Sequence, residues 1–170
     1  VNSLDVGAVL SWDGALQVWT NAGDCEPLKP LTGYYIYMNA AGVAEIVPNS
    51  DPLVANPPPV KHLSAGLNLV GIASLENQDV ITALSSVYNV TGGLEGYVSV
   101  INPAINPDVD WDNNLYNRND PNPPTMQIAK AYWVFMLNSG DLVGSTTTPL
   151  DPLTCYYPGG NKCPPGTSGG

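Results

Sequence analysis

The stretch Gly33-Tyr34-Tyr35-Ile36-Tyr37-Met38-Asn39-Ala40-Ala41-Gly42 occurs a second time, with changes, as Ala131-Tyr132-Trp133-Val134-Phe135-Met136-Leu137-Asn138-Ser139-Gly140. Each copy is a run of aromatic and branched residues of strand length that ends in a small polar turn and a glycine. A gap-free match between so many bulky residues rarely arises by chance. The sequence therefore predicts an internal repeat. Because bulky residues fill both faces of each run, we expect both strands to be buried on two sides.

The composition predicts a mainly β protein. The chain has 170 residues, which suits one domain or two small ones, and its hydrophobic content of 44% is enough for a core. Only 12% of the residues are charged, while glycine and proline each number 17. This balance is typical of loop-rich β architecture, and we expect β-sandwich or barrel-like modules.

The net charge of the chain is −10, from five basic and fifteen acidic residues. This charge argues against binding to nucleic acid or to anionic membrane surfaces, both of which attract clusters of Lys and Arg. It is compatible with divalent cations, since Ca²⁺ prefers carboxylate and carbonyl oxygens. No apolar stretch approaches the roughly 20 residues that span a bilayer, so we expect no membrane insertion.

The repeat divides the chain into unequal parts. We expect an incomplete first repeat over 1–47, a proline-rich linker over 48–62 and a fuller second repeat over 63–144. The second repeat contains a long insertion at 102–124, rich in Asn, Asp and Pro. A tail of Thr, Pro, Gly and Cys follows over 145–170 and cannot build a core of its own.

The second repeat contains elements that the first lacks. Its opening strand covers Leu67–Ile72, and its apolar stripe at Val80, Ala83, Leu84 and Val87 predicts one short helix at about 79–88. Asn77 or Asp79 can cap this helix. The following strand, Gly96-Tyr97-Val98-Ser99-Val100, corresponds to Gly7-Ala8-Val9-Leu10, where the first repeat begins.

Three hairpins are expected from the turn residues. The Asp13-Gly14 pair predicts a tight two-residue hairpin between Val9–Trp12 and Leu16–Trp19. After each aromatic strand, a short strand is expected to pair back across the turn, namely Val43–Val47 and Asp141–Val143.

Asp108, Asp110, Asp112 and Asn114 form the candidate calcium loop. Their spacing places several oxygen ligands on one side of an extended or looped segment. The loop is not an EF-hand, because Asn113 stands where that motif has Gly and Asn119 where it has a bidentate Glu. The alternatives are a calcium loop of another kind and a solvated acidic loop.

Two covalent features are expected. Of the three cysteines, Cys155 and Cys163 could close a small loop, which would leave Cys25 free or joined to another chain; Cys25 could equally pair with one of the tail cysteines. One disulfide favours an exported protein. Asn89-Val90-Thr91 is a candidate glycosylation sequon.

Nothing in the sequence identifies an enzyme. His62 is the sole histidine, and we expect a surface or packing role for it, since no nucleophile-elbow sequence accompanies it. No pair of carboxylates stands out for glycoside hydrolysis. The aromatic residues could stack on sugar rings, but core packing is the better interpretation of the two aromatic strands.

The order of these motifs resembles a repeat of bacterial and archaeal surface proteins. Ala65-Gly66-Leu67-Asn68-Leu69-Val70-Gly71, a short helix and then Ala131-Tyr132-Trp133-Val134-Phe135-Met136 are similar to its "GWNLVG", helix and "GYWVYM" pattern, which occurs on S-layer-associated and other secreted proteins. Here Leu67 replaces the usual Trp and Ala131 the usual Gly. The similarity covers about 7–47 and 63–143. It implies a mainly β module outside the cell and supplies no active site.

The favoured hypothesis is an extracellular structural protein that associates with copies of itself by β-strand addition, as a filament or S-layer-type subunit. A repeat that lacks a strand exposes an open sheet edge, and the ends 1–6 and 145–170 are candidate donors. The first alternative is a carbohydrate-binding or adhesion module that binds polysaccharide through Trp12, Trp19, Trp111 and the tyrosine-rich surface. The second is a hydrolase in the acidic loop. A beginning at Val1 without Met suggests a processed chain or a fragment.

Overall fold

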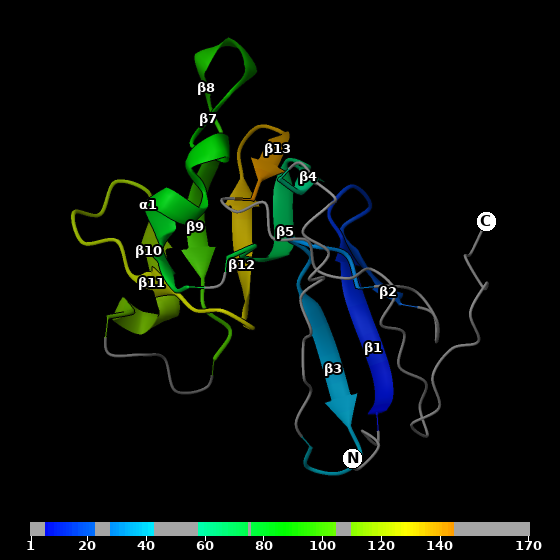
Figure 1. Cartoon of the computed structure of the whole chain (residues 1–170). Coiled ribbons are helices and arrows are strands. Elements are labelled where there is room, and N and C mark those ends of the chain that lie inside the picture. Colours follow the sequence, from blue (N-terminus) through cyan, green and yellow to red (C-terminus); the bar gives the residue numbers. More distant parts are fainter. Residues whose placement is uncertain (1–5, 23–27, 43–57, 75, 105–109, 145–170) are drawn as a thin grey trace, which may run out of the picture.

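The computed structural model describes residues 6–22, 28–42, 58–74, 76–104 and 110–144. Its first part is a three-stranded antiparallel sheet in the order β2-β1-β3, made of β1 (Val6–Asp13), β2 (Val18–Asn21) and β3 (Tyr34–Met38). Figure 1 shows these strands in blue and cyan on one side of the molecule. The hairpin between β1 and β2 is confirmed, but its loop has four residues, Gly14 to Gln17, because Asp13 Oδ1 accepts hydrogen bonds from the N–H groups of Ala15 and Leu16.

The second part contains a four-stranded sheet in the order β10-β9-β12-β5. Its strands are β5 (Gly66–Gly71), β9 (Tyr97–Ile101), β10 (Leu115–Asn117) and β12 (Ala131–Met136). Three small two-stranded sheets join β4 (Val60–Leu63) with β13 (Gly140–Val143), β6 (Gln78–Asp79) with β11 (Thr125–Met126), and β7 (Asn89–Val90) with β8 (Leu94–Glu95). The expected mainly β architecture is confirmed.

The helix expected near 79–88 is present as α1 (Val80–Ala83), followed by the 3-10 turn η1 (Ser85–Val87). Asp79 caps it, since its Oδ1 accepts the N–H of Thr82 at 2.9 Å and its Oδ2 accepts the Thr82 hydroxyl at 2.7 Å. Two further 3-10 turns are η2 (Thr91–Gly93) and η3 (Asp112–Asn114). Within the described chain, no helix is long and apolar enough to cross a bilayer.

The core lies on one face of the four-stranded sheet. Tyr132, Val134 and Met136 of β12 point into it and are buried. The helical segment covers this face with the apolar stripe expected from the sequence, and its residues Val80, Leu84 and Val87 belong to the same buried cluster. The other residues of β12, among them Phe135, lie on the opposite, more exposed face. The expectation of a strand buried on both sides is therefore wrong for β12.

The expectation is also wrong for β3, whose residues Tyr35, Ile36 and Tyr37 are exposed. No buried cluster forms on either side of this strand among the described residues. The return pairing expected after β12 is wrong too, because β13 pairs with β4, with Asp141 opposite His62. Strand β4 begins at Val60, inside the stretch assigned to the linker, and β10 lies inside the expected insertion. The Val43–Val47 pairing lies outside the described residues.

The pairs β1–β3 and β9–β12 share one arrangement. Both are antiparallel, with Val9 opposite Ile36 in the first and Val100 opposite Val134 in the second. Each pair has a bulge at the same place, formed by one extra residue, Gly7 in β1 or Val98 in β9. The two aromatic strands thus occupy equivalent positions in their pairs, and the internal repeat itself stays a prediction. Within these pairs, Val9 of β1 takes the position of Val100 of β9. The sequence predicts that Val9 corresponds to Val98, so the alignment of β1 with β9 is shifted by two residues from the expected one.

The outer edges of the two aromatic strands differ. Strand β5 pairs with β12 on the side away from β9, with Asn68 opposite Val134. Among the described strands, none pairs with β3 on the side away from β1. In the described part of the chain, β3 is thus an edge strand where its counterpart is a central one.

Candidate association surface

Strand β3 presents an apolar, uncharged surface at the edge of its sheet. The exposed fractions are 54% for Tyr35, 43% for Ile36 and 66% for Tyr37. The whole strand, Tyr34–Met38, contains no Asp, Glu, Lys, Arg or His. Edge strands usually carry charges, prolines or bulges that prevent pairing with other chains. Strand β3 contains no charged residue and no proline, and the extra residue of the bulge belongs to β1.

The hydrogen bonds of β1 show which residues of β3 point their backbone N–H and C=O groups toward the outer edge. The Val9 carbonyl accepts the N–H of Ala22, so the polar backbone groups of Val9 face β2 and those of its neighbour Leu10 face β3. Leu10 stands opposite Tyr35, which therefore bonds to β1. The N–H and C=O of the next residue, Ile36, point to the outer edge.

The bulge at Gly7 shapes this surface. A Cβ atom at Gly7 would lie 2.7 Å from Tyr37 Cδ1 and 2.9 Å from Asn39 Oδ1, closer than real Cβ contacts. Glycine at this position therefore leaves room for the Tyr37 ring beside the bulge. The bulge stands on the β1 side of β3, so it does not obstruct the outer edge.

The outer edge of β5, by contrast, is covered by the first part of the chain. The Gln17 side chain acts as a short strand there, since its Nε2 donates to the Leu67 carbonyl at 2.9 Å and its Oε1 accepts the Leu67 N–H at 3.1 Å. Trp12 Nε1 donates to the same carbonyl at 2.7 Å. Further along, Gly33 N–H donates to Leu69 O and Gly71 N–H to Leu31 O. The chain thus protects the edge of β5 with specific contacts.

Four aromatic rings join the two parts. Trp12 contacts Trp19 and Trp133 edge to face, with ring centroids 5.4 Å and 5.2 Å apart. Trp19 also contacts Trp133 at 5.6 Å and Tyr35 at 5.7 Å. Edge-to-face contact is a favourable geometry for aromatic pairs. Because Trp19 and Tyr35 remain partly exposed, this cluster continues into the β3 surface.

The described residues of the candidate calcium loop form hydrogen bonds with other residues of the chain. Asp110 Oδ2 accepts the N–H of Thr125 at 2.8 Å, and Asp112 Oδ1 accepts from Asn113 Nδ2 at 2.9 Å. Asn114 Nδ2 donates to Ala104 O. Among the described residues, no three metal-ligating side chains gather. Asp108 lies outside them, so calcium binding stays a prediction.

The covalent features are tested only in part. Cys25, Cys155 and Cys163 lie outside the described residues. Asn89 is exposed at the start of a hairpin that projects from the molecule (Figure 1), and its Oδ1 accepts a hydrogen bond from Arg118 Nη2 at 3.4 Å. The position is accessible to modification, and glycosylation stays a prediction.

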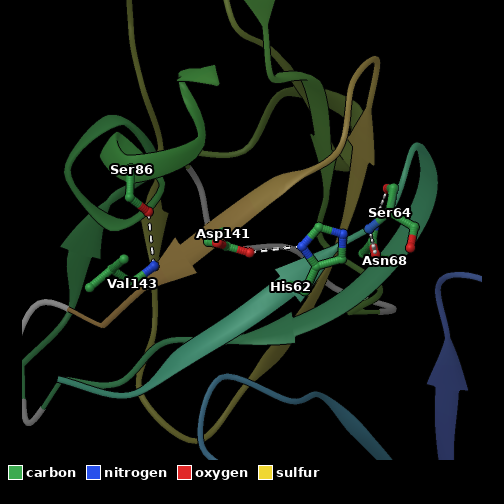
Figure 2. Close-up of polar contacts among 6 residues, drawn as sticks. All are labelled: His62, Ser64, Asn68, Ser86, Asp141 and Val143. Carbon is green, nitrogen blue, oxygen red and sulfur yellow. Dashed lines mark hydrogen bonds and ion pairs between the residues drawn. The ribbon is translucent and has the colours of Figure 1, made fainter. Parts of the chain in front are cut away.

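His62 lies on the surface, as expected. Its Nδ1 lies 2.8 Å from Asp141 Oδ1, and both side chains are more than half exposed. Figure 2 shows the pair across β4 and β13, with Val143 N–H donating to Ser86 Oγ farther along β13. Figure 2 also shows Asn68 beside Ser64, whose N–H donates to Asn68 Oδ1. An exposed pair of this kind contributes little to stability.

Trp111, expected at a sugar-binding face, is buried. Its ring stacks on Tyr132 with centroids 5.4 Å apart, and its Nε1 donates to Thr125 O at 2.9 Å. Trp111 is therefore a core residue that holds the 110–126 loop against the sheet. The expected carbohydrate surface loses this residue and keeps Trp19.

Two basic side chains have positions that the sequence did not indicate. The buried Arg118 guanidinium lies 3.9 Å from the centre of the Tyr88 ring and donates to Tyr97 O at 3.3 Å. Lys61 Nζ donates to Leu69 O at 2.9 Å. Burial, with a smaller effect of Lys29, lowers the pKa of Lys61 from 10.5 to about 8.

Three acidic or phenolic groups also titrate away from their ordinary range. The hydrogen bond from the Thr82 hydroxyl is the main cause that lowers the pKa of Asp79. Burial raises the pKa of Tyr97 and of Tyr116. None of these groups lies on β3.

Comparisons with protein families, with characterised proteins and with solved structures found no match to this chain.

Proposed function

We propose that this chain is an extracellular structural protein that associates with copies of itself by β-strand addition. One observation carries the proposal: within the part of the chain that the structure describes, β3 is an uncharged edge strand with exposed Tyr35, Ile36 and Tyr37. A strand added to such an edge forms backbone hydrogen bonds and removes the apolar side chains from water. The edge of β5 supports the proposal by contrast. Side chains from the first part of the chain cover that edge with hydrogen bonds, whereas no described strand pairs with the outer edge of β3.

The size of the assembly depends on which edge of the second copy is used. A contact between two different edges, such as β3 of one copy and β2 of the next, continues without closing and produces a filament. A contact between identical edges closes at a dimer. The composition, with low charge and many Pro and Gly residues, suits an exported protein.

The proposal is tested by blocking the outer edge of β3. Ile36→Pro removes the outward N–H of Ile36 and leaves the hydrogen bonds of Tyr35 and Tyr37 to β1 in place. Ile36→Thr keeps the N–H and serves as the matched control. We expect the wild type and the threonine variant to form concentration-dependent oligomers in sedimentation velocity, and the proline variant to stay monomeric. A wild type that is monomeric at every concentration would contradict the proposal.

A second function is favoured by the exposed aromatic rings. Trp19, Tyr35 and Tyr37 lie on the same face of the three-stranded sheet. They stand opposite Trp12, Leu10 and Ala8, and these three residues share one face of β1 because they are every second residue of that strand. Aromatic rings in such a row can stack on sugar rings, so we also propose polysaccharide binding as the alternative. Titration of tryptophan fluorescence with soluble cell-wall glycans tests it, with Tyr37→Ala as the variant expected to bind more weakly. An unchanged signal with every glycan would remove this alternative.

A further inference from the structure

We infer that the strand added to β3 is β3 of a second copy, paired antiparallel about a two-fold axis at Ile36. This inference rests on the proposed function and names the partner of the same edge. In this arrangement Ile36 stands opposite its own copy, and Tyr35 stands opposite the partner subunit's Tyr37. The sheet then continues through both copies as β2-β1-β3-β3-β1-β2.

The second part of the chain supplies the geometry. Its strand β12 matches β3 in register and in the position of the bulge, and it binds β5 on the edge where β3 has no partner among the described strands. Strand β5 is antiparallel and places Asn68 opposite Val134, the residue that corresponds to Ile36. An antiparallel strand centred on Ile36 therefore repeats a pairing that this chain already forms.

The backbone of β3 is suited to pairing with itself. The outward N–H and C=O of Ile36 place it at a hydrogen-bonded position, where two antiparallel residues exchange both bonds. A two-fold axis at this residue satisfies that pattern with identical strands. The neighbouring Tyr35 and Tyr37 then fall at positions without hydrogen bonds, where side chains approach more closely and aromatic pairs are favourable.

The charge of the chain favours contact at this strand. Each copy carries a net charge of −10, so two copies repel one another overall. Strand β3 carries no charged residue, and its two faces are both apolar at the edge. Pairing with itself thus brings apolar side chains opposite apolar side chains and places no carboxylates opposite one another.

The inference is tested with charges at the axis. In the two-fold pairing, Ile36→Lys places two cations opposite each other and Ile36→Glu places two anions opposite each other. We expect each variant alone to dimerise at least about 10-fold more weakly than the wild type, and an equimolar mixture to recover a mixed dimer in sedimentation velocity. Ile36→Thr is the control that is expected to keep dimerising, and circular dichroism checks that every variant is folded.

Each other outcome has a distinct meaning. If each variant alone is monomeric and the mixture stays monomeric while the wild type associates, the two-fold pairing is overturned and strand addition to a different edge remains. If both variants associate like the wild type, β3 is not the contact, and both the inference and the proposed function fall. Because Ile36 is partly exposed in the single chain, loss of folding is not expected for any of the three.

Discussion

At the scale of single residues, Lys61 gives the chain a stability that depends on pH. Its pKa is lowered to about 8 in the folded protein, so the unfolded chain holds this proton more tightly. The resulting stability is fully present above the ordinary pKa near 10.5 and is lost as the pH falls through about 8.

We therefore expect the free energy of unfolding to rise by about 1–2 kcal/mol between about pH 7.5 and pH 9.5 relative to a Lys61→Met variant. Urea denaturation at both pH values measures this difference. The raised pKa values of Tyr97 and Tyr116 act mainly above pH 10 and equally in both proteins. An identical pH slope in the two proteins would show that Lys61 titrates normally.

Trp12 contributes a hydrogen bond that crosses between the two parts of the chain. Trp12→Phe keeps an aromatic ring near Trp19 and Trp133 but removes the bond to the Leu67 carbonyl. We expect a loss of about 1 kcal/mol in the free energy of unfolding. Leu16→Ala, at an exposed position, is the control and is expected to change stability by less than about 0.5 kcal/mol. Equal losses in both variants would argue against a specific role for the Trp12 bond.

At the scale of elements, Gly96 fixes the approach of β9 to the helical segment. A Cβ atom at this position would overlap the Val87 carbonyl oxygen. We expect Gly96→Ala to lower the free energy of unfolding by about 3 kcal/mol or more, as measured by thermal or urea denaturation. Gly71→Ala is the matched control, because its Cβ would meet the Thr32 and Lys130 carbonyl oxygens only at ordinary distances of 3.7 and 3.8 Å. Comparable losses in both would contradict this account of Gly96.

The elements also show how far the sequence could predict the fold. The helical segment, its Asp79 cap and the two aromatic strands follow from local patterns, and the structure confirms them. The pairing of β13 with β4 joins residues far apart in the chain, so no local pattern encodes it. The sequence did not predict the exposure of β3. The alternating side chains of a strand show how bulky each of its faces is, but they do not show whether another element covers that face.

The sequence could predict the candidate surface only indirectly, from secondary-structure elements that the first part of the chain is expected to lack. The sequence predicts a first repeat that begins without the strand and helix that precede Gly96 in the second. It does not show that Gln17 and Trp12 cover β5, since an amide side chain that replaces a strand has no sequence signature. The position of Trp111 in the core was missed for a similar reason, because burial of a lone tryptophan depends on distant partners.

At the scale of the whole molecule, the charge of each copy should make association depend on salt. Two copies of net charge −10 repel one another, and salt screens this repulsion while leaving the proposed backbone pairing and apolar burial at β3 largely unchanged. We expect the apparent Kd of self-association to fall several-fold as the ionic strength rises from about 0.01 M to about 0.15 M. Sedimentation velocity at a series of salt concentrations measures the trend. Weaker association at higher salt would instead point to a contact between opposite charges.

The cover over β5 has a consequence for synthesis on the ribosome. Trp12, Gln17 and Leu31 precede β5 in the chain, so they leave the ribosome before the strand that they protect. Nascent chains on one message are crowded together, and an unguarded strand there can pair with its neighbours. In this chain the residues that cover β5 have already been synthesised when Gly66–Gly71 emerges. The order of the residues therefore favours early protection of β5, and the proposed contact with another copy uses β3, whose outer edge has no partner among the described strands.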